Sequence, residues 1–133
     1  MRTIGIDYGK KRVGVAISDE IGDFAYPYGV LVNTKRLVKE ILEICKKEGV
    51  GEIVIGESLD FKGNKNQIMG DVEKFKAELE KETELPVKYE NEFMTSAEAS
   101  RGQGFVDKLD ASAAAIILRT YLNRKNLSAG NIG

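Results

Sequence analysis

Residues 4–19 read IGIDYGKKRVGVAISD, and this stretch decides the fold. Residues 3–7 have the continuous apolar character of a buried strand, and residues 12–18 alternate branched apolar side chains with small ones. The segment 8–11 between them has the glycine and the length of a hairpin turn. The sequence therefore predicts an antiparallel strand pair whose first strand ends at Asp7.

Apolar periodicity outlines the rest of the chain as further strands and helices. Pro27 suggests an edge or a bulge in the third strand, and Asn33 or Thr34 is expected to cap the first helix, which Gly49 ends. The predicted elements are strands 3–7, 12–18 and 24–32, a helix from about 34 to 48, a strand at 52–56, a helix from 68, a strand at 86–89, a short helix at 95–101 and a long helix at 109–124.

This order predicts an α/β fold built on a mixed five-stranded sheet. Three antiparallel strands come first, parallel crossovers follow, and helices cover both faces of the sheet. A chain of 133 residues is about one domain, which we expect to span residues 1–125, with a flexible tail at 126–133. In sheets of this kind, sites gather at the carboxyl ends of the parallel strands.

The composition narrows the chemistry that the chain can perform. It contains no histidine and one cysteine, Cys45, so a Ser-His-Asp triad, histidine metal ligands and an internal disulfide are excluded. Cys45 lies on an apolar helical stripe and is expected to be an inert core thiol. No apolar run is long enough to cross a membrane, and no signal segment is recognisable, so the cytoplasm is the expected location.

Acidic residues follow several of the predicted strands. Asp7 could bind a metal ion or cap its own turn, and Glu57 could be a ligand or a solvated residue at the sheet rim. The remaining candidates are Glu90, Glu92, Asp107 and Asp110. If the sheet brings two or three of these carboxylates together, they could hold a pair of Mg²⁺ ions about 4 Å apart, and Mn²⁺ is chemically compatible.

Basic residues lie close to the acidic set in turns or near helix ends. Lys11 and Arg12 follow Asp7 in the first turn, and Arg101 ends the predicted short helix. They could position substrate phosphates, although each alone could equally belong to a solvated charged surface. The net charge of −1 gives no support to binding of nucleic acid over the whole surface.

Four blocks of the sequence, in this order along the chain, resemble the YqgF/RuvX family: residues 4–19, Ile53-Val-Ile-Gly56 with Gly63, Glu92 with Thr95-Ser96 and Glu98-Ala99, and Asp110-Ala-Ser-Ala-Ala with Ile117-Leu118 and Tyr121-Leu122. Members of that family have a ribonuclease-H-like fold and are assigned as Holliday-junction resolvases or as nucleases in maturation of the pre-16S rRNA. The resemblance implies catalytic and metal-binding roles for Asp7, Glu92 and Asp110.

Two departures from the family pattern bear on the site. Glu57-Ser58 stands where the family usually has Leu-Pro, and it supplies a carboxylate where related resolvases of this fold often have one. Asn91-Glu92-Phe93 stands where the family usually has Asp-Glu-Arg, so a substrate-contacting arginine is missing. Glu57 is therefore a candidate additional ligand.

The sequence leaves three functional interpretations open. The first is a Mg²⁺-dependent nuclease acting on structured nucleic acid, either at the 5′ end of the pre-16S rRNA or on branched DNA, as a monomer or a homodimer. The second is a noncatalytic nucleic-acid-binding or assembly module with a degenerate site. The third starts from Asp7-Tyr8-Gly9, which also resembles the phosphate-binding hairpin of sugar kinases, although 133 residues leave no room for their second domain.

Overall fold

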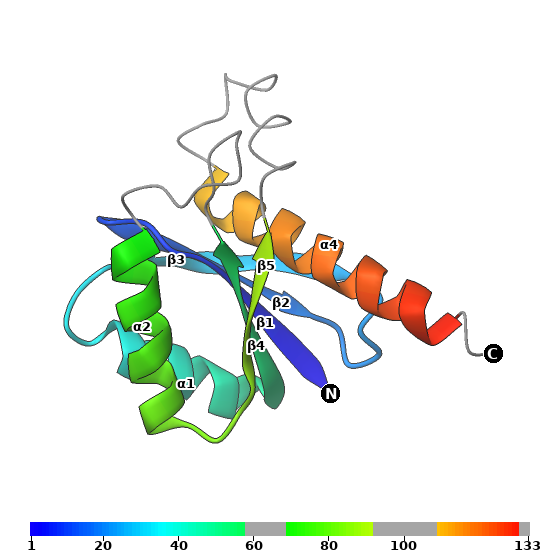
Figure 1. Cartoon of the computed structure of the whole chain (residues 1–133), viewed down its shortest axis with the longest axis horizontal. Helices are drawn as coiled ribbons and strands as arrows, with labels where there is room; N and C mark the ends of the chain where they lie inside the picture. The colour runs from blue at the N-terminus through cyan, green and yellow to red at the C-terminus, as the bar shows by residue number, and fades with distance from the viewer. Residues whose placement is uncertain (58–68, 92–108, 131–133) are drawn as a thin grey trace.

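The computed structural model describes residues 1–57, 69–91 and 109–130 of the chain (Figure 1). Five strands and three helices lie within these ranges. They are β1 (Arg2–Asp7), β2 (Arg12–Ser18), β3 (Ala25–Val32), α1 (Leu37–Glu48), β4 (Val50–Glu57), α2 (Met69–Glu82), β5 (Val87–Asn91) and α4 (Leu109–Gly130). The short helix predicted at 95–101 lies outside the described residues.

The strands form one mixed sheet in the order β3-β2-β1-β4-β5. β1 pairs antiparallel with β2, and β2 pairs antiparallel with β3. β4 pairs parallel with both β1 and β5. The predicted α/β fold is thus confirmed. Pro27 lies in the edge strand β3, where the register with β2 shifts between Val15 and Ala16, so the predicted edge and bulge are both present.

One face of the sheet packs against α1 and α2. Ile4 and Ile6 of β1 and Ile53 and Ile55 of β4 point into this core, where each is fully buried. Cys45 of α1 joins them at 4% exposure, as predicted for a core thiol. Side chains alternate along a strand, so the intervening residues face the other side.

The ends of α1 show one correct and one wrong prediction. Gly49 ends the helix with a φ of 69°, and its N–H donates to the carbonyl of Cys45. The N-cap is Arg36, without a side-chain cap, rather than Asn33 or Thr34. Thr34 forms a turn just before the helix, because its hydroxyl accepts from the N–H of Arg36, and Asn33 is held by the β1–β2 turn.

The opposite face of the sheet is covered by α4 (Figure 1). Small residues allow this close packing. A Cβ placed on Gly5 of β1 would lie 2.8 Å from the Cβ of Leu118 and 3.1 Å from the carbonyl oxygen of Ala114. Ala16 of β2 and Val54 of β4 are fully buried in the same core. The prediction of helices on both faces is therefore correct.

The last helix is longer than the sequence indicated. α4 continues to Gly130, through residues 126–130 that we assigned to a tail. No proline or glycine interrupts the chain between Arg124 and Gly130, and the Asn126 side chain donates to the carbonyl of Gly22 at 3.2 Å. None of the helices in the described ranges is long and apolar enough to cross a membrane.

Candidate active site

Three neighbouring strands end at the same edge of the sheet. β1 ends at Asp7, one residue after Ile6, which pairs with Ile55 of β4. β4 ends at Glu57, which pairs with Asn91 at the end of β5. Because β1, β4 and β5 run in the same direction, their carboxyl ends lie side by side, as the sequence analysis expected for a site.

Helix α4 begins above this edge. Ala114 packs over Gly5, and α4 runs antiparallel to β1, since its later residues Tyr121 and Lys125 lie near the start of that strand. Asp110 is one helical turn before Ala114, about 6 Å along the axis. Asp7 is two residues beyond Gly5 on the same face of β1. The backbone therefore brings positions 7 and 110 toward the same end of the sheet.

The structure describes the predicted site residues unequally. Asp7 is partly buried and interacts with a neighbouring group. The backbones of Glu57 and Asp110 are placed, but their side chains lie outside the described part, as do Glu92 and Arg101 entirely. Among the described residues, no group of three acidic or cysteine side chains comes together. The predicted ligand set accordingly remains a prediction.

The donor chemistry of this edge fits a hard divalent cation. Asp7 supplies carboxylate oxygen at the end of a rigid strand, and Mg²⁺ prefers oxygen ligands in proteins. The chain has no histidine, and its one cysteine, Cys45 of α1, is buried in the core, so imidazole and thiolate ligands are not available at this edge. The residue types therefore agree with the Mg²⁺ or Mn²⁺ expected from the sequence.

The β1–β2 turn beside Asp7 is held in one conformation. Asn33 donates from its side chain to the carbonyl of Gly9 at 2.8 Å, and its own N–H donates to the carbonyl of Lys11 at 2.9 Å. A Cβ on Gly9 would lie 2.4 Å from the carbonyl oxygen of Arg12, so only glycine fits there. Lys11 and Arg12 are both exposed on this fixed turn.

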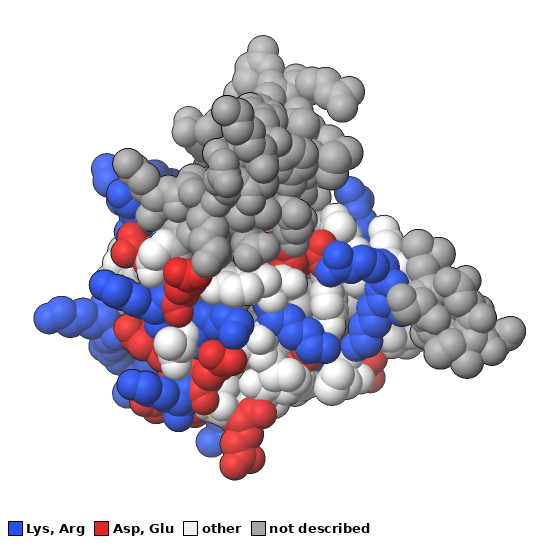
Figure 2. Space-filling model, in the orientation of Figure 1, with Lys and Arg blue, Asp and Glu red and all other residues white. Residues whose placement is uncertain are grey.

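A cavity of about 500 Å³ adjoins the site on the α1 and α2 side. Tyr8, the residue after Asp7, forms part of its wall and contacts the ring of Phe75 at a centroid distance of 5.0 Å. Lys35 and Lys74 line it together with Asp71 and Glu78, so the charges at its wall balance. Figure 2 likewise shows basic and acidic side chains intermixed over this part of the surface.

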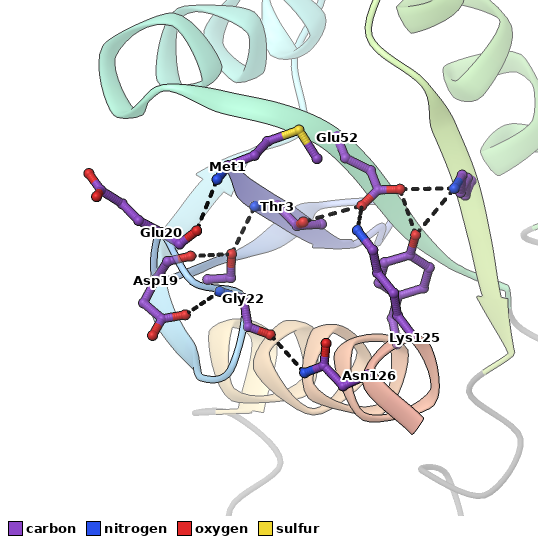
Figure 3. Close-up of polar contacts among 11 residues, drawn as sticks. Met1, Thr3, Asp19, Glu20, Gly22, Glu52, Lys125 and Asn126 are labelled. Atoms are coloured by element: carbon purple, nitrogen blue, oxygen red, sulfur yellow. Dashed lines mark hydrogen bonds and ion pairs between the residues drawn. The ribbon is translucent and has the colours of Figure 1, made fainter. Parts of the chain in front are cut away.

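A buried polar cluster, which the sequence patterns did not predict, lies between the sheet and α4 (Figure 3). Glu52 of β4 is only 3% exposed, and its carboxylate binds groups from β1, β5 and α4. Its contacts are Thr3 Oγ1 at 3.3 Å, Lys88 Nζ at 3.0 Å, Tyr121 OH at 2.5 Å and Lys125 Nζ at 3.3 Å. A charged residue beginning an otherwise apolar buried strand was the available signal, because such a charge must be paired.

The contacts within this cluster shift the pKa values of its side chains. Burial opposes ionisation of Glu52, but hydrogen bonds from Tyr121 and Lys88 and the charge of Lys125 hold its pKa below the ordinary value. Burial and the hydrogen bond to Glu52 raise the pKa of Tyr121. The hydrogen bonds to Glu52 and Tyr121 raise the pKa of Lys88. The carboxylate is therefore ionised at neutral pH, and α4 is tied to three strands.

Glu90 is the second buried acid that the fold employs. It was one of two candidates flanking Asn91, and its side chain is 3% exposed and paired with the guanidinium of Arg124 in α4. This ion pair links β5 to the last helix. The described contacts thus give Glu90 a role in holding α4, while Glu92 stays the candidate for the site.

Solved structures share this architecture. RuvC of T. thermophilus in complex with a Holliday junction substrate matches with a TM-score of 0.62 and 16% identity, over 94% of this chain and 95% of that chain. The Holliday junction resolvase of fowlpox virus matches with a TM-score of 0.51 and 16% identity, over 93% of this chain and 99% of that chain. The chain therefore has the RuvC-like form of the ribonuclease H fold.

Sequence relatives narrow this class to one family. Residues 1–124 match the family described as "RuvX: Holliday junction resolvase". A Maridesulfovibrio salexigens protein named "Putative pre-16S rRNA nuclease" is 40% identical, over 93% of this chain and 99% of its own length. A protein of the same name from Nitratidesulfovibrio vulgaris is 35% identical, over 92% of this chain and 94% of its own length. The chain belongs to the RuvX/YqgF family of nucleases.

Proposed function

We propose that this protein is a metal-dependent nuclease that hydrolyses phosphodiester bonds in the 5′ region of the pre-16S rRNA. The observation that carries the proposal is the position of Asp7, at the carboxyl end of the central strand β1, between the exposed Lys11-Arg12 turn and the end of β4. A carboxylate fixed there has a rigid backbone behind it and basic groups beside it, which suits a metal ligand that must meet a phosphate.

The proposed roles follow the sequence predictions. Asp7, Glu92 and Asp110 hold the cation and are the catalytic residues, with Glu57 as an additional carboxylate. Lys11, Arg12 and Arg101 position the phosphates of the substrate. A bound Mg²⁺ or Mn²⁺ would activate a water molecule and neutralise charge on the leaving oxygen, which suits a chain that has no histidine to act as a base. Asp7 then serves to orient that cation against the scissile phosphate.

The relatives favour a ribosomal RNA precursor as the substrate. The proteins that are 40% and 35% identical both carry names referring to the pre-16S rRNA. Such a substrate would place the protein in the cytoplasm. Branched DNA is the second candidate, because the family is described as a Holliday junction resolvase. RNA and DNA differ in helix form and in the 2′-hydroxyl. Cleavage assays on the two substrates side by side can therefore show which of them the protein prefers.

The decisive experiment compares the wild type with Asp7→Asn on a structured RNA that spans the 5′ end of the 16S sequence and on a four-way DNA junction. We expect Mg²⁺- or Mn²⁺-dependent cleavage of the RNA by the wild type and a loss of at least about a hundredfold in Asp7→Asn. Calorimetric titration with Mg²⁺ alone should show weaker binding to the variant. Thermal unfolding should show that both proteins are folded.

Glu43→Gln is the matched control, because it removes one carboxylate from the exposed surface of α1. It should cleave and bind Mg²⁺ like the wild type. Cleavage of the junction but not of the RNA would identify branched DNA, rather than the pre-16S rRNA, as the substrate. A wild-type protein that binds RNA but cuts neither substrate with either metal would overturn the nuclease proposal in favour of a noncatalytic module, which the altered Asn91-Glu92-Phe93 segment also permits.

A further inference from the structure

The large exposed hydrophobic side chains are concentrated in one stretch of the described part of the chain. Seven such side chains are exposed, and all but Met1 lie between residues 21 and 32, in the β2–β3 turn and in β3. Their exposed fractions range from 42% to 80%. We call this set the β3 patch, and its members are Ile21, Phe24, Tyr26, Tyr28, Val30 and Val32.

The β3 patch lies on an edge strand. β3 pairs with β2 on one side, and no strand of the described ranges pairs with its other side. An edge strand presents backbone N–H and C=O groups to any second strand, and proteins commonly protect such edges with charged side chains. None of the eight residues of β3 is charged. Within the described ranges, Pro27 and the bulge are the protective features of this strand, so β3 is suited to a partner.

The charges that flank β3 have opposite signs at its two ends. Glu20 and Asp23, in the turn before the strand, are exposed and acidic. Lys35 and Arg36, just after the strand, are exposed and basic. If two copies of β3 pair antiparallel, the acidic end of each meets the basic end of the other, and the uncharged strands meet in the middle. Parallel pairing would instead bring like charges together. The strand is therefore self-complementary in one orientation.

The area of the patch is adequate for a modest dimer. Aromatic side chains carry roughly 150–250 Å² each, and Phe24, Tyr26 and Tyr28 are 61%, 56% and 42% exposed. Together with the three aliphatic side chains, the patch exposes on the order of 600 Å² per copy, divided between the two faces of the sheet along β3, against about 800 Å² per partner in a standard interface. Main-chain hydrogen bonds between the strands would supplement this apolar area.

We propose that β3 pairs antiparallel with β3 of a second copy of this chain, so that two five-stranded sheets join into one continuous sheet. A two-fold axis between the two strands makes the contact isologous. The β1 strands that end at Asp7 then lie five strand spacings apart, on the order of 24 Å. This assembly is inferred from β3 alone, and it stands or falls independently of the nuclease proposal.

Sedimentation equilibrium of the full chain over a range of concentrations tests the proposal. The wild type should approach twice the chain mass, and Val30→Lys/Val32→Lys should raise the dissociation constant at least tenfold, because pairing would bury unpaired charges. Both valines are exposed, so urea unfolding should show that the variant is as stable as the wild-type monomer. Thr120→Lys, which adds a charge on the exposed side of α4, should dimerise normally.

Exchanging the charges at the two ends of β3 distinguishes antiparallel pairing of two β3 strands from other modes of association. Asp23→Lys and Lys35→Glu should each weaken the dimer, and the double variant should recover most of the loss because opposite charges face each other again. Hydrogen exchange should show β3 amides that become protected as the concentration rises. A wild type that stays monomeric, a dimer that the valine variant leaves intact, or a charge exchange without recovery would each overturn the proposal.

Discussion

The Tyr121 hydroxyl lies 2.5 Å from Glu52 Oε2 and donates to it, joining helix α4 to strand β4. Lys125, one turn later in α4, contacts the other oxygen of the same carboxylate at 3.3 Å. The position of α4 along the sheet is thus fixed at this end by a buried ionised group. The opposite end of the helix carries Asp110 to the candidate site.

Glu52→Gln should destabilise the protein in a pH-dependent manner. The folded-state pKa of Glu52 lies below its ordinary value of 4.5, so its contribution to the free energy of unfolding is fully present above that value. The contribution is lost as the pH falls through the folded-state pKa. We expect the variant to be less stable by about 1–3 kcal/mol at neutral pH. Urea unfolding at several pH values measures this difference.

The acid end of the same pH series tests whether the effect depends on the ionised form of Glu52. As the pH falls below 4.5 and through the lowered folded-state pKa of Glu52, the stabilities of the wild type and Glu52→Gln should converge, because the wild-type carboxylate becomes protonated. Glu43→Gln, which changes an exposed acid of α1, should leave the pH profile unchanged. A stability difference between wild type and Glu52→Gln that stays constant down to acid pH would show that the ionised form has no special role.

Two glycine substitutions should act in opposite directions. In Gly5→Ala the new Cβ would lie 2.8 Å from the Cβ of Leu118, so α4 must shift, and we expect a loss of about 1–3 kcal/mol. In Gly70→Ala the new Cβ meets nothing within 4 Å in the first turn of α2, and we expect a gain of about 0.5–1 kcal/mol. Chemical denaturation of both variants and the wild type measures these changes in the free energy of unfolding. Equal effects would mean that α4 does not pack closely on β1.

The single thiol should be unreactive in the folded protein. Burial raises the pKa of Cys45 to about 11, so little thiolate exists near pH 8. We expect the native protein to react with a thiol reagent about a hundredfold more slowly than the urea-unfolded chain. Absorbance of the released chromophore follows both reactions. Comparable rates would indicate that α1 opens readily, in conflict with its packing on the sheet.

The basic turn should affect substrate binding and its salt dependence. Lys11→Ala/Arg12→Ala should weaken RNA binding and reduce the slope of log affinity against log salt by about 2, because we propose that each side chain contacts one phosphate. Lys81→Ala, at the far end of α2, should leave the slope unchanged. Binding measured at several salt concentrations in Asp7→Asn avoids cleavage. An unchanged slope in the double variant would show that the turn does not contact the phosphates of the substrate.

The order of strands and helices was predictable because the local signals were strong. The period-two pattern of residues 12–18 and the glycine at 49 define their elements without help from distant residues. Boundaries depended on tertiary contacts instead. The cap of α1 was wrong because Asn33 is engaged by the β1–β2 turn, a contact with Gly9 that spans 24 positions and that no local pattern reveals.

The sequence predicted which strands end together at the candidate edge, but not the buried contacts that hold α4 on the sheet. A strand that ends in an acid before a glycine turn pointed to Asp7, and the parallel order of strands placed Glu57 at the same edge. The partners of Glu52 and Glu90 could not be found in this way. They come from β5 and from the second half of α4, and only the packed structure brings Lys88, Arg124 and Lys125 to those buried acids.

The contact between Gly5 and Leu118 joins the first strand of the chain to its last helix. During synthesis, the sheet face that carries Ala16 and Val54 has no cover until the chain has been made past residue 122. A nascent chain therefore keeps an apolar face open until its final helix emerges. It also cannot bring positions 7 and 110 toward one edge before then, so an activity that depends on both positions would appear only after α4 has been made.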